Sequence, residues 1–153
     1  MTTVTTDSQD LETRLRRLED LTAINQLFVD YGVFLDSHDF EGYASLFADD
    51  GEILLGPLGR AKGPEQIRQM MEKNLGPVGG GSFHLVTSPR VELDGDKATA
   101  KVMWTVIQRD GDGKPFVGMI GHHIDELVRR DGRWLFFRRA GRVDIPSAYP
   151  TGK

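Results

Sequence analysis

Hydrophobic residues recur every three or four positions in the first half of the chain, and this spacing predicts helices. One stripe runs over residues 11–35, so a long amphipathic helix with one face on a core is expected there. Polar residues at 7–10 precede the stripe and suit the first turn of that helix. A short helix is expected over residues 40–47. A third begins at Gly63-Pro64, because proline is tolerated in the first turn of a helix.

After the glycine-rich segment 76–81 the hydrophobic period changes to two, which predicts strands. Asp-Gly pairs separate the long segments, and Asp-Gly favours tight hairpin turns because it accepts positive φ. Consecutive hairpins predict an antiparallel meander. The expected strands cover residues 52–56, 83–93, 98–108, 116–128 and 134–143.

Helices followed by an antiparallel sheet indicate an α+β fold in a single domain. Long strands twist and curl, and Pro89, Gly118 and Gly121 are the expected points of bulging or bending. The helices must cover the concave face, which leaves a pocket between helix and sheet. We expect a disordered segment over residues 1–9, the domain over 10–145 and a tail over 146–153. The segment 76–81 is interpreted as either a lid edge or a linker.

The composition is that of a globular protein, with 39% hydrophobic and 27% charged residues. No apolar run approaches the ~20 residues of a membrane span, and the first ten residues lack the features of a signal peptide. The net charge of −4 provides no overall attraction to nucleic acid or to anionic membranes. The absence of cysteine excludes disulfides and thiol chemistry. We therefore expect a cytoplasmic protein with no nucleic-acid or membrane partner.

Asp36 and His84 have the clearest chemical potential in the chain. Asp36 lies near the end of the first predicted helix, and His84 lies on a predicted strand. A carboxylate that orients an imidazole produces a general base that works near neutral pH. On the pattern alone a buried structural histidine is favoured over a base, because both faces of the strand are partly apolar. Asp36 could simply end its helix.

Six segments of the sequence, considered together, resemble the SnoaL-like branch of the nuclear-transport-factor-2-like superfamily. They are residues 18–27, residues 31–40 with Asp36 and His38, residues 46–51, His84, residues 94–98 and residues 127–134. The resemblance spans nearly the whole chain and implies a cone-shaped α+β barrel, with three helices on a strongly curved, mostly antiparallel sheet around a pocket. It also implies a homo-oligomer, a dimer or a trimer. It does not select a reaction, because the family includes dehydratases, dehydrohalogenases, isomerases and non-catalytic subunits.

Within the family, the sequence is most similar to members with an Asp–His pair: scytalone dehydratase, bile-acid 7α-dehydratase and lindane dehydrochlorinase. Asp36 matches their helix aspartate and His84 their strand histidine. Tyr31 matches a functional tyrosine of the bile-acid enzyme. The resemblance implies that His84 is a general base, that Asp36 orients it, and that Tyr31 donates a hydrogen bond to the substrate.

The sequence departs from scytalone dehydratase at positions that face the substrate. Two tyrosines correspond to Leu35 and Leu55, a second histidine falls near residues 102–104, where this chain has none, and an asparagine corresponds to His123. Scytalone is therefore not expected as the substrate. The residues expected to contact substrate are His123, Leu35, Leu55, Trp104, Met103, Phe47 and Arg142.

Other polar residues carry weaker signals. His122 and His123 are adjacent on a strand, so only one can enter the pocket. Arg138, Arg139 and Arg142 could hold an anionic group, although a solvated strand face is the simpler interpretation. Without cysteine, His-x-His or HExxH, neither a metal nor a cofactor is expected.

The predicted function is a cofactor-independent lyase that performs a dehydratase-like elimination on a small hydrophobic substrate, with polycyclic and aromatic compounds as candidates. His84 takes a proton, Asp36 orients His84, and Tyr31 with His123 donates to the developing oxyanion or leaving group. One alternative is a ketosteroid-isomerase-like proton shuttle. Another is a non-catalytic binding or structural subunit, in which Asp36 and His84 need not touch.

Overall fold

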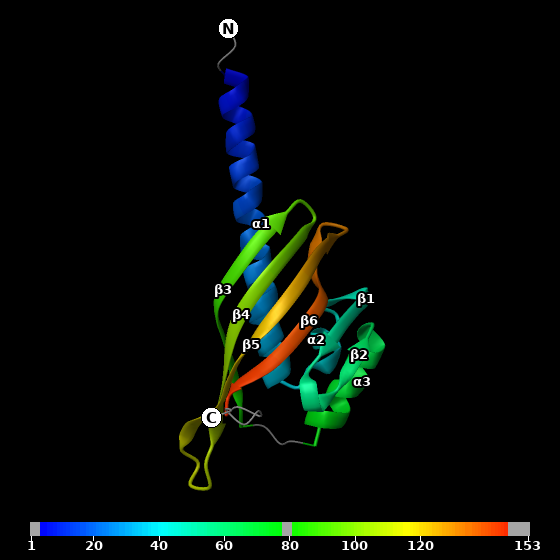
Figure 1. Cartoon of the computed structure of the whole chain (residues 1–153), viewed down its shortest axis with the longest axis vertical. Helices are drawn as coiled ribbons and strands as arrows, with labels where there is room; N and C mark the ends of the chain where they lie inside the picture. Colours follow the sequence, from blue (N-terminus) through cyan, green and yellow to red (C-terminus); the bar gives the residue numbers. More distant parts are fainter. Residues whose placement is uncertain (1–3, 78–80, 147–153) are drawn as a thin grey trace, which may run out of the picture.

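The computed structural model describes residues 4–77 and 81–146, with only the backbone described for residues 4–7. Helices lie against one face of a single sheet (Figure 1). The helices are α1 (Val4–Asp36), α2 (Phe40–Ala44) and α3 (Pro64–Leu75), with a short 3-10 turn at Gly56–Leu58. The strands are β1 (Phe47–Leu54), β2 (Arg60–Lys62), β3 (Phe83–Asp94), β4 (Lys97–Arg109), β5 (Pro115–Arg130) and β6 (Arg133–Ile145).

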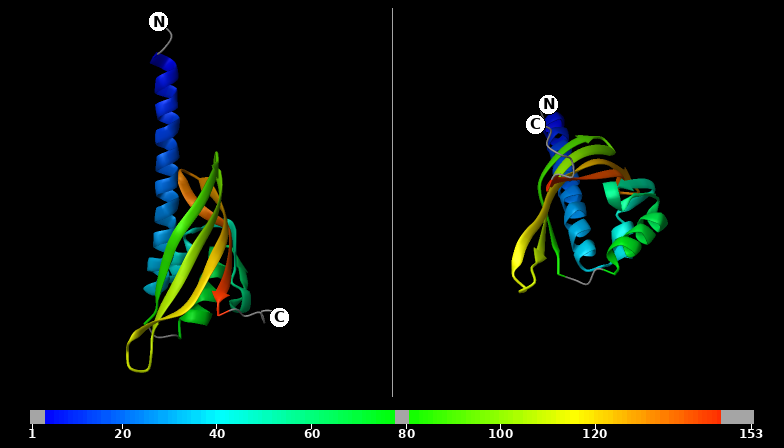
Figure 2. Two further views of the ribbon diagram at one scale, coloured as in Figure 1. Left: turned by 60° about the vertical axis from the view of Figure 1, so that its left-hand side comes forward. Right: turned by 60° about the horizontal axis from the view of Figure 1, so that its bottom comes forward.

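The sheet has the strand order β2-β1-β6-β5-β4-β3, and only β1 and β6 pair in parallel. The four long strands form the meander that the Asp-Gly turns predicted. The register shifts at Pro89, at Gly118 and next to Gly121, as predicted. These bulges bend the strands around α1, so the sheet is curled but not closed (Figure 2). A Cβ at Gly121 would lie 2.2 Å from the Trp104 ring, so only glycine allows this close approach.

Helix α1 covers the concave face with its C-terminal half and projects beyond the sheet with its N-terminal half (Figures 1 and 2). The predicted stripe therefore meets the core only from Ile24 onward. Leu11, Leu15 and Leu18 remain 58%, 57% and 62% exposed, because no strand extends beneath them. No helix in residues 4–77 and 81–146 is long and apolar enough to cross a membrane.

Several predicted boundaries were wrong. Residues 4–9 belong to α1 rather than to a disordered segment, so residues 7–10 lie inside the helix instead of capping it. The second helix ends at Ala44, because the chain then joins the sheet, where the Phe136 N–H donates to the carbonyl oxygen of Leu46 at 2.8 Å. Strand β1 consequently begins at Phe47, and β2 was not predicted. Residues 78–80 of the glycine-rich segment and 147–153 of the expected tail lie outside the described residues.

Candidate active site

Asp36 and His84 lie in direct contact. The Nδ1 atom of His84 is 2.6 Å from Oδ1 of Asp36, and the backbone N–H of His84 lies 3.0 Å from both carboxylate oxygens. A carboxylate only accepts hydrogen bonds, so the proton of a neutral His84 ring sits on Nδ1. Nε2 is then left with a lone pair, which is the arrangement that a general base requires.

The end of α1 places this pair. Asp36 is the last residue of α1, where the helix dipole disfavours a negative charge. The ring and backbone N–H groups of His84 offset that cost. Gly32, one turn earlier, lets β3 approach the helix, because a Cβ at position 32 would lie 3.1 Å from the carbonyl oxygen of His84. The short distance between helix and strand therefore depends on a residue without a side chain.

A cavity of about 330 Å³ opens beside His84, between α1, α3 and the inner face of the sheet. Its surface is mostly apolar. Seven of the predicted site residues line it, namely Tyr31, Leu35, Leu55, His84, Trp104, His123 and Arg142. The sequence did not single out the other lining residues, which are Pro57, Leu58, Met71, Leu75, Val86, Val106, Met119, Gly141 and Val143.

Met103 and Phe47 do not line the cavity, contrary to expectation. Val102 and Trp104 point inward from β4, so strand alternation directs Met103 to the opposite face of the sheet. Phe47 is buried in the core, with its ring centroid 5.2 Å from that of Phe136. It stabilises the wall behind the cavity without reaching its surface.

His122 and His123 point to opposite faces, as predicted. His123 is buried and lines the cavity, whereas Nδ1 of His122 is 2.7 Å from the Asp144 carboxylate on the outer face. Only one of the two imidazoles can therefore meet a molecule in the cavity.

Behind the cavity lies a buried ion pair that the sequence did not reveal. Arg139 and Asp125 are 0% and 1% exposed, with Nη1 of the arginine 3.5 Å from Oδ2 of the aspartate. Arg139 therefore does not lie on a solvated strand face, as the simpler interpretation held. Its guanidinium carbon is 4.0 Å from the ring centroid of Tyr31 and 4.3 Å from that of Phe136. These two cation–π contacts help to stabilise the buried charge.

Tyr31 connects this ion pair to the cavity. Its hydroxyl is 3.0 Å from that of Tyr43, and its ring packs against the His123 ring, with centroids 5.4 Å apart. Burial is the main cause that raises the pKa of both tyrosines above the ordinary value of 10.0. Both hydroxyls therefore keep their protons near neutral pH and can act as donors.

Burial, followed by the nearby Arg139 charge, lowers the pKa of His123 well below 6.5. The unfolded chain then binds a proton below about pH 6.5 that the folded chain does not, so the folded chain loses stability on acidification. His123→Phe removes this loss. The free energy of unfolding of the variant, relative to the unmodified chain, should rise as the pH falls below 6.5, by at most about 1.4 kcal/mol for each pH unit. Urea titrations from pH 8 to pH 5 measure the difference, and parallel stability curves would contradict the prediction.

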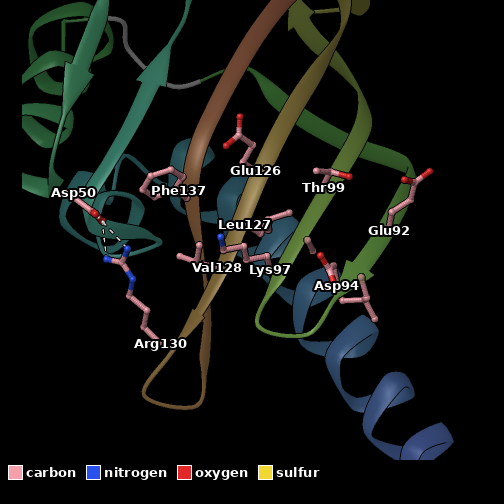
Figure 3. A pocket seen from close by; sticks show the side chains of 12 residues that line it. Asp50, Glu92, Asp94, Lys97, Thr99, Glu126, Leu127, Val128, Arg130 and Phe137 are labelled. Carbon is pink, nitrogen blue, oxygen red and sulfur yellow. Dashed lines mark hydrogen bonds and ion pairs between the residues drawn. The ribbon is translucent and has the colours of Figure 1, made fainter.

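A second hollow, of about 570 Å³, lies on the other face of the sheet, with α1 behind the strands (Figure 3). Charged side chains line much of it, and Arg130 pairs there with Asp50 at 2.6 Å. Lys97, Thr99 and Glu126 are exposed around it. It holds no paired imidazole and carboxylate, so we place the candidate site in the smaller cavity beside His84.

Comparison with known proteins agrees with this fold. The architecture is that of the cystatin-like, nuclear-transport-factor-2-like class. Residues 16–140 match the family model described as a SnoaL-like domain, and the chain belongs to this family.

Three relatives illustrate the range. The chain is 29% identical over 126 residues to gamma-hexachlorocyclohexane dehydrochlorinase of Sphingobium indicum, covering 82% of this chain and 81% of that protein. An NTF2-like protein of Novosphingobium aromaticivorans with a cystatin-like fold superposes with a TM-score of 0.83 at 27% identity, covering 97% and 94%. A putative scytalone dehydratase from the same organism superposes with a TM-score of 0.73 at 25% identity, covering 90% and 96%.

Proposed function

We propose that this protein is a cofactor-independent lyase that eliminates water or hydrogen halide from a small, uncharged, apolar substrate. The observation that carries the proposal is the contact of 2.6 Å between Nδ1 of His84 and Asp36, beside an apolar cavity. A protein that only binds or assembles does not require this contact. The similarity to a dehydrochlorinase and to a scytalone dehydratase-like protein supports lyase-type activity.

The proposed reaction uses His84 as the base. Nε2 takes a proton from carbon, the electrons of that C–H bond form the new C=C bond, and the bond to the leaving group breaks with its electron pair. Asp36 stabilises the imidazolium that forms and keeps the ring in orientation. The departing group accepts hydrogen bonds from Tyr31 or His123. A departing hydroxide takes the proton from His84 and leaves as water, whereas a halide leaves as the anion and His84 releases its proton to solvent, so the dyad returns to its starting state in both cases.

The size and lining of the cavity also restrict which substrates can bind. Its volume of about 330 Å³ is near the lower end of the ~300–1,000 Å³ typical of ligand pockets, which favours a single ring over a polycyclic skeleton. Arg142 borders the cavity from β6, but it is exposed and pairs in register with His122, so its charge points to the outer face of the sheet. We therefore propose a compact, uncharged cyclic substrate that carries a leaving group next to an acidic C–H bond.

The test is an elimination assay with three probes: gamma-hexachlorocyclohexane, 3-hydroxycyclohexanone and 3-cyclohexen-1-one. Chloride release from the first or enone formation from the second, faster than with His84→Ala, supports the lyase. Faster conversion of the third probe to the conjugated enone, with neither elimination, would favour the isomerase instead. Equal rates for the unmodified chain and His84→Ala on all three probes would overturn the proposed base.

A further inference from the structure

His123 presents its two ring nitrogens to different surroundings. Nδ1 lies 2.7 Å from Nη2 of Arg139 in the buried core. A guanidinium has only donors, so Nδ1 must accept this hydrogen bond. The proton of the neutral imidazole is then on Nε2, at the other edge of the ring. His84 is in the opposite state, because its Nδ1 faces a carboxylate.

Arg139 holds this arrangement firmly. It is fully buried, its Nη1 is 3.5 Å from Asp125, and its guanidinium lies over the rings of Tyr31 and Phe136. Asp125 and Arg139 are paired in register on neighbouring strands, on the same inner face as His123. The donor to Nδ1 therefore has little freedom to turn away.

The Nε2 edge of His123 faces the cavity wall formed by Gly141 and Leu55. A Cβ at Gly141 would lie 3.3 Å from both Nε2 and Cδ2 of His123, and 2.9 Å from Leu55. Among residues 4–77 and 81–146, no protein group accepts a hydrogen bond from Nε2. The N–H group is thus an uncommitted donor in a cavity whose surface is otherwise largely apolar.

We propose that Arg139, held by Asp125, is a positioning residue that fixes His123 as a neutral Nε2–H donor to the leaving group or carbonyl oxygen of the substrate. This rests on the proposed lyase function and assigns the two imidazoles opposite roles. The carboxylate partner makes His84 a base, and the guanidinium partner makes His123 a donor. The arrangement suits an uncharged substrate with one acceptor atom near the acidic C–H bond, such as a β-hydroxy ketone or an alkyl halide.

The first test requires no substrate. In ¹⁵N NMR spectra of the histidine-labelled full chain, His123 should carry its proton on Nε2 and His84 on Nδ1. The double variant Asp125→Leu/Arg139→Met removes the pair without leaving an unpaired charge, and its His123 ring should populate both tautomers. A proton on Nδ1 of His123 in the unmodified chain would overturn the proposal, as would an unchanged tautomer in the folded double variant.

The second test measures the donor. His123→Gln places an amide N–H near the former Nε2 and should retain most of kcat, whereas His123→Phe should lose about 10²–10³-fold in kcat with little change in KM. His122→Phe, the adjacent histidine on the outer face, is the matched control and should keep full activity. Equal kcat for His123→Phe and the unmodified chain would contradict the donor role of His123 without contradicting the lyase function. If none of the three probes reacts, the proposed lyase function is contradicted, and the NMR spectra alone test the tautomer of His123.

Discussion

Replacing His84 with alanine is expected to lower kcat by about 10⁴-fold for any substrate that the chain eliminates, because no other described group in the cavity matches its base geometry. Asp36→Asn should lower kcat by about 10²–10⁴-fold. An amide cannot stabilise the imidazolium, and it can hold the ring in the wrong tautomer. The His84 side chain is 21% exposed, so its truncation should leave the fold in place. Circular dichroism and stopped-flow turnover of the most reactive probe measure the two effects.

Asp39→Asn is the matched control for Asp36→Asn. Asp39 lies three residues further along, is exposed, and accepts a hydrogen bond from the Gly42 N–H at 2.8 Å as the N-cap of α2. Asparagine caps helices about as well as aspartate, so this change should alter neither stability nor kcat. If the two variants lost kcat equally, the negative charge of this region rather than a specific contact would explain the loss. Asp36 would then not be the orienting group.

The contact between Asp36 and His84 could be predicted, but only from the family resemblance. The strand around His84 has apolar residues on both faces, so alternation alone could not place the imidazole. Tertiary structure resolves this ambiguity, because Gly32 brings β3 against the end of α1. The meander and its bulges could be predicted from the sequence itself, because Asp-Gly turns, proline and glycine act through local backbone geometry.

The pair formed by Asp125 and Arg139 could not be found in the same way. Ile124 and Glu126 alternate with His123, Asp125 and Leu127, so the local pattern mixes polar and apolar residues on both faces. A register shift next to Glu126 then decides which side chains of β5 and β6 share the inner face. Register is a property of paired strands, and nothing in the single segment around Arg139 distinguishes a buried arginine from a solvated one.

The second large effect concerns stability. Arg139→Met should destabilise the folded chain by about 3–5 kcal/mol near pH 8, because it leaves the buried Asp125 carboxylate without its counter-ion. The double variant Asp125→Leu/Arg139→Met leaves no such charge and should recover most of this loss. Apart from their ion pair, the Asp125 oxygens and two Arg139 nitrogens have no hydrogen-bond partner among the described residues. An apolar replacement therefore forfeits few hydrogen bonds.

The pH dependence of that cost distinguishes an unpaired charge from a simple packing defect. Burial raises the pKa of Asp125 to about 6 even though Arg139 lowers it, so Arg139→Met should raise it further. The folded variant then binds a proton at a higher pH than the unfolded chain, and its stability relative to the unmodified chain should increase as the pH falls from 8 to 5. Urea unfolding at both pH values tests this. A loss of equal size at pH 5 and pH 8, or a double variant as unstable as Arg139→Met, would show that the cavity left by the side chain, rather than the Asp125 charge, determines the cost.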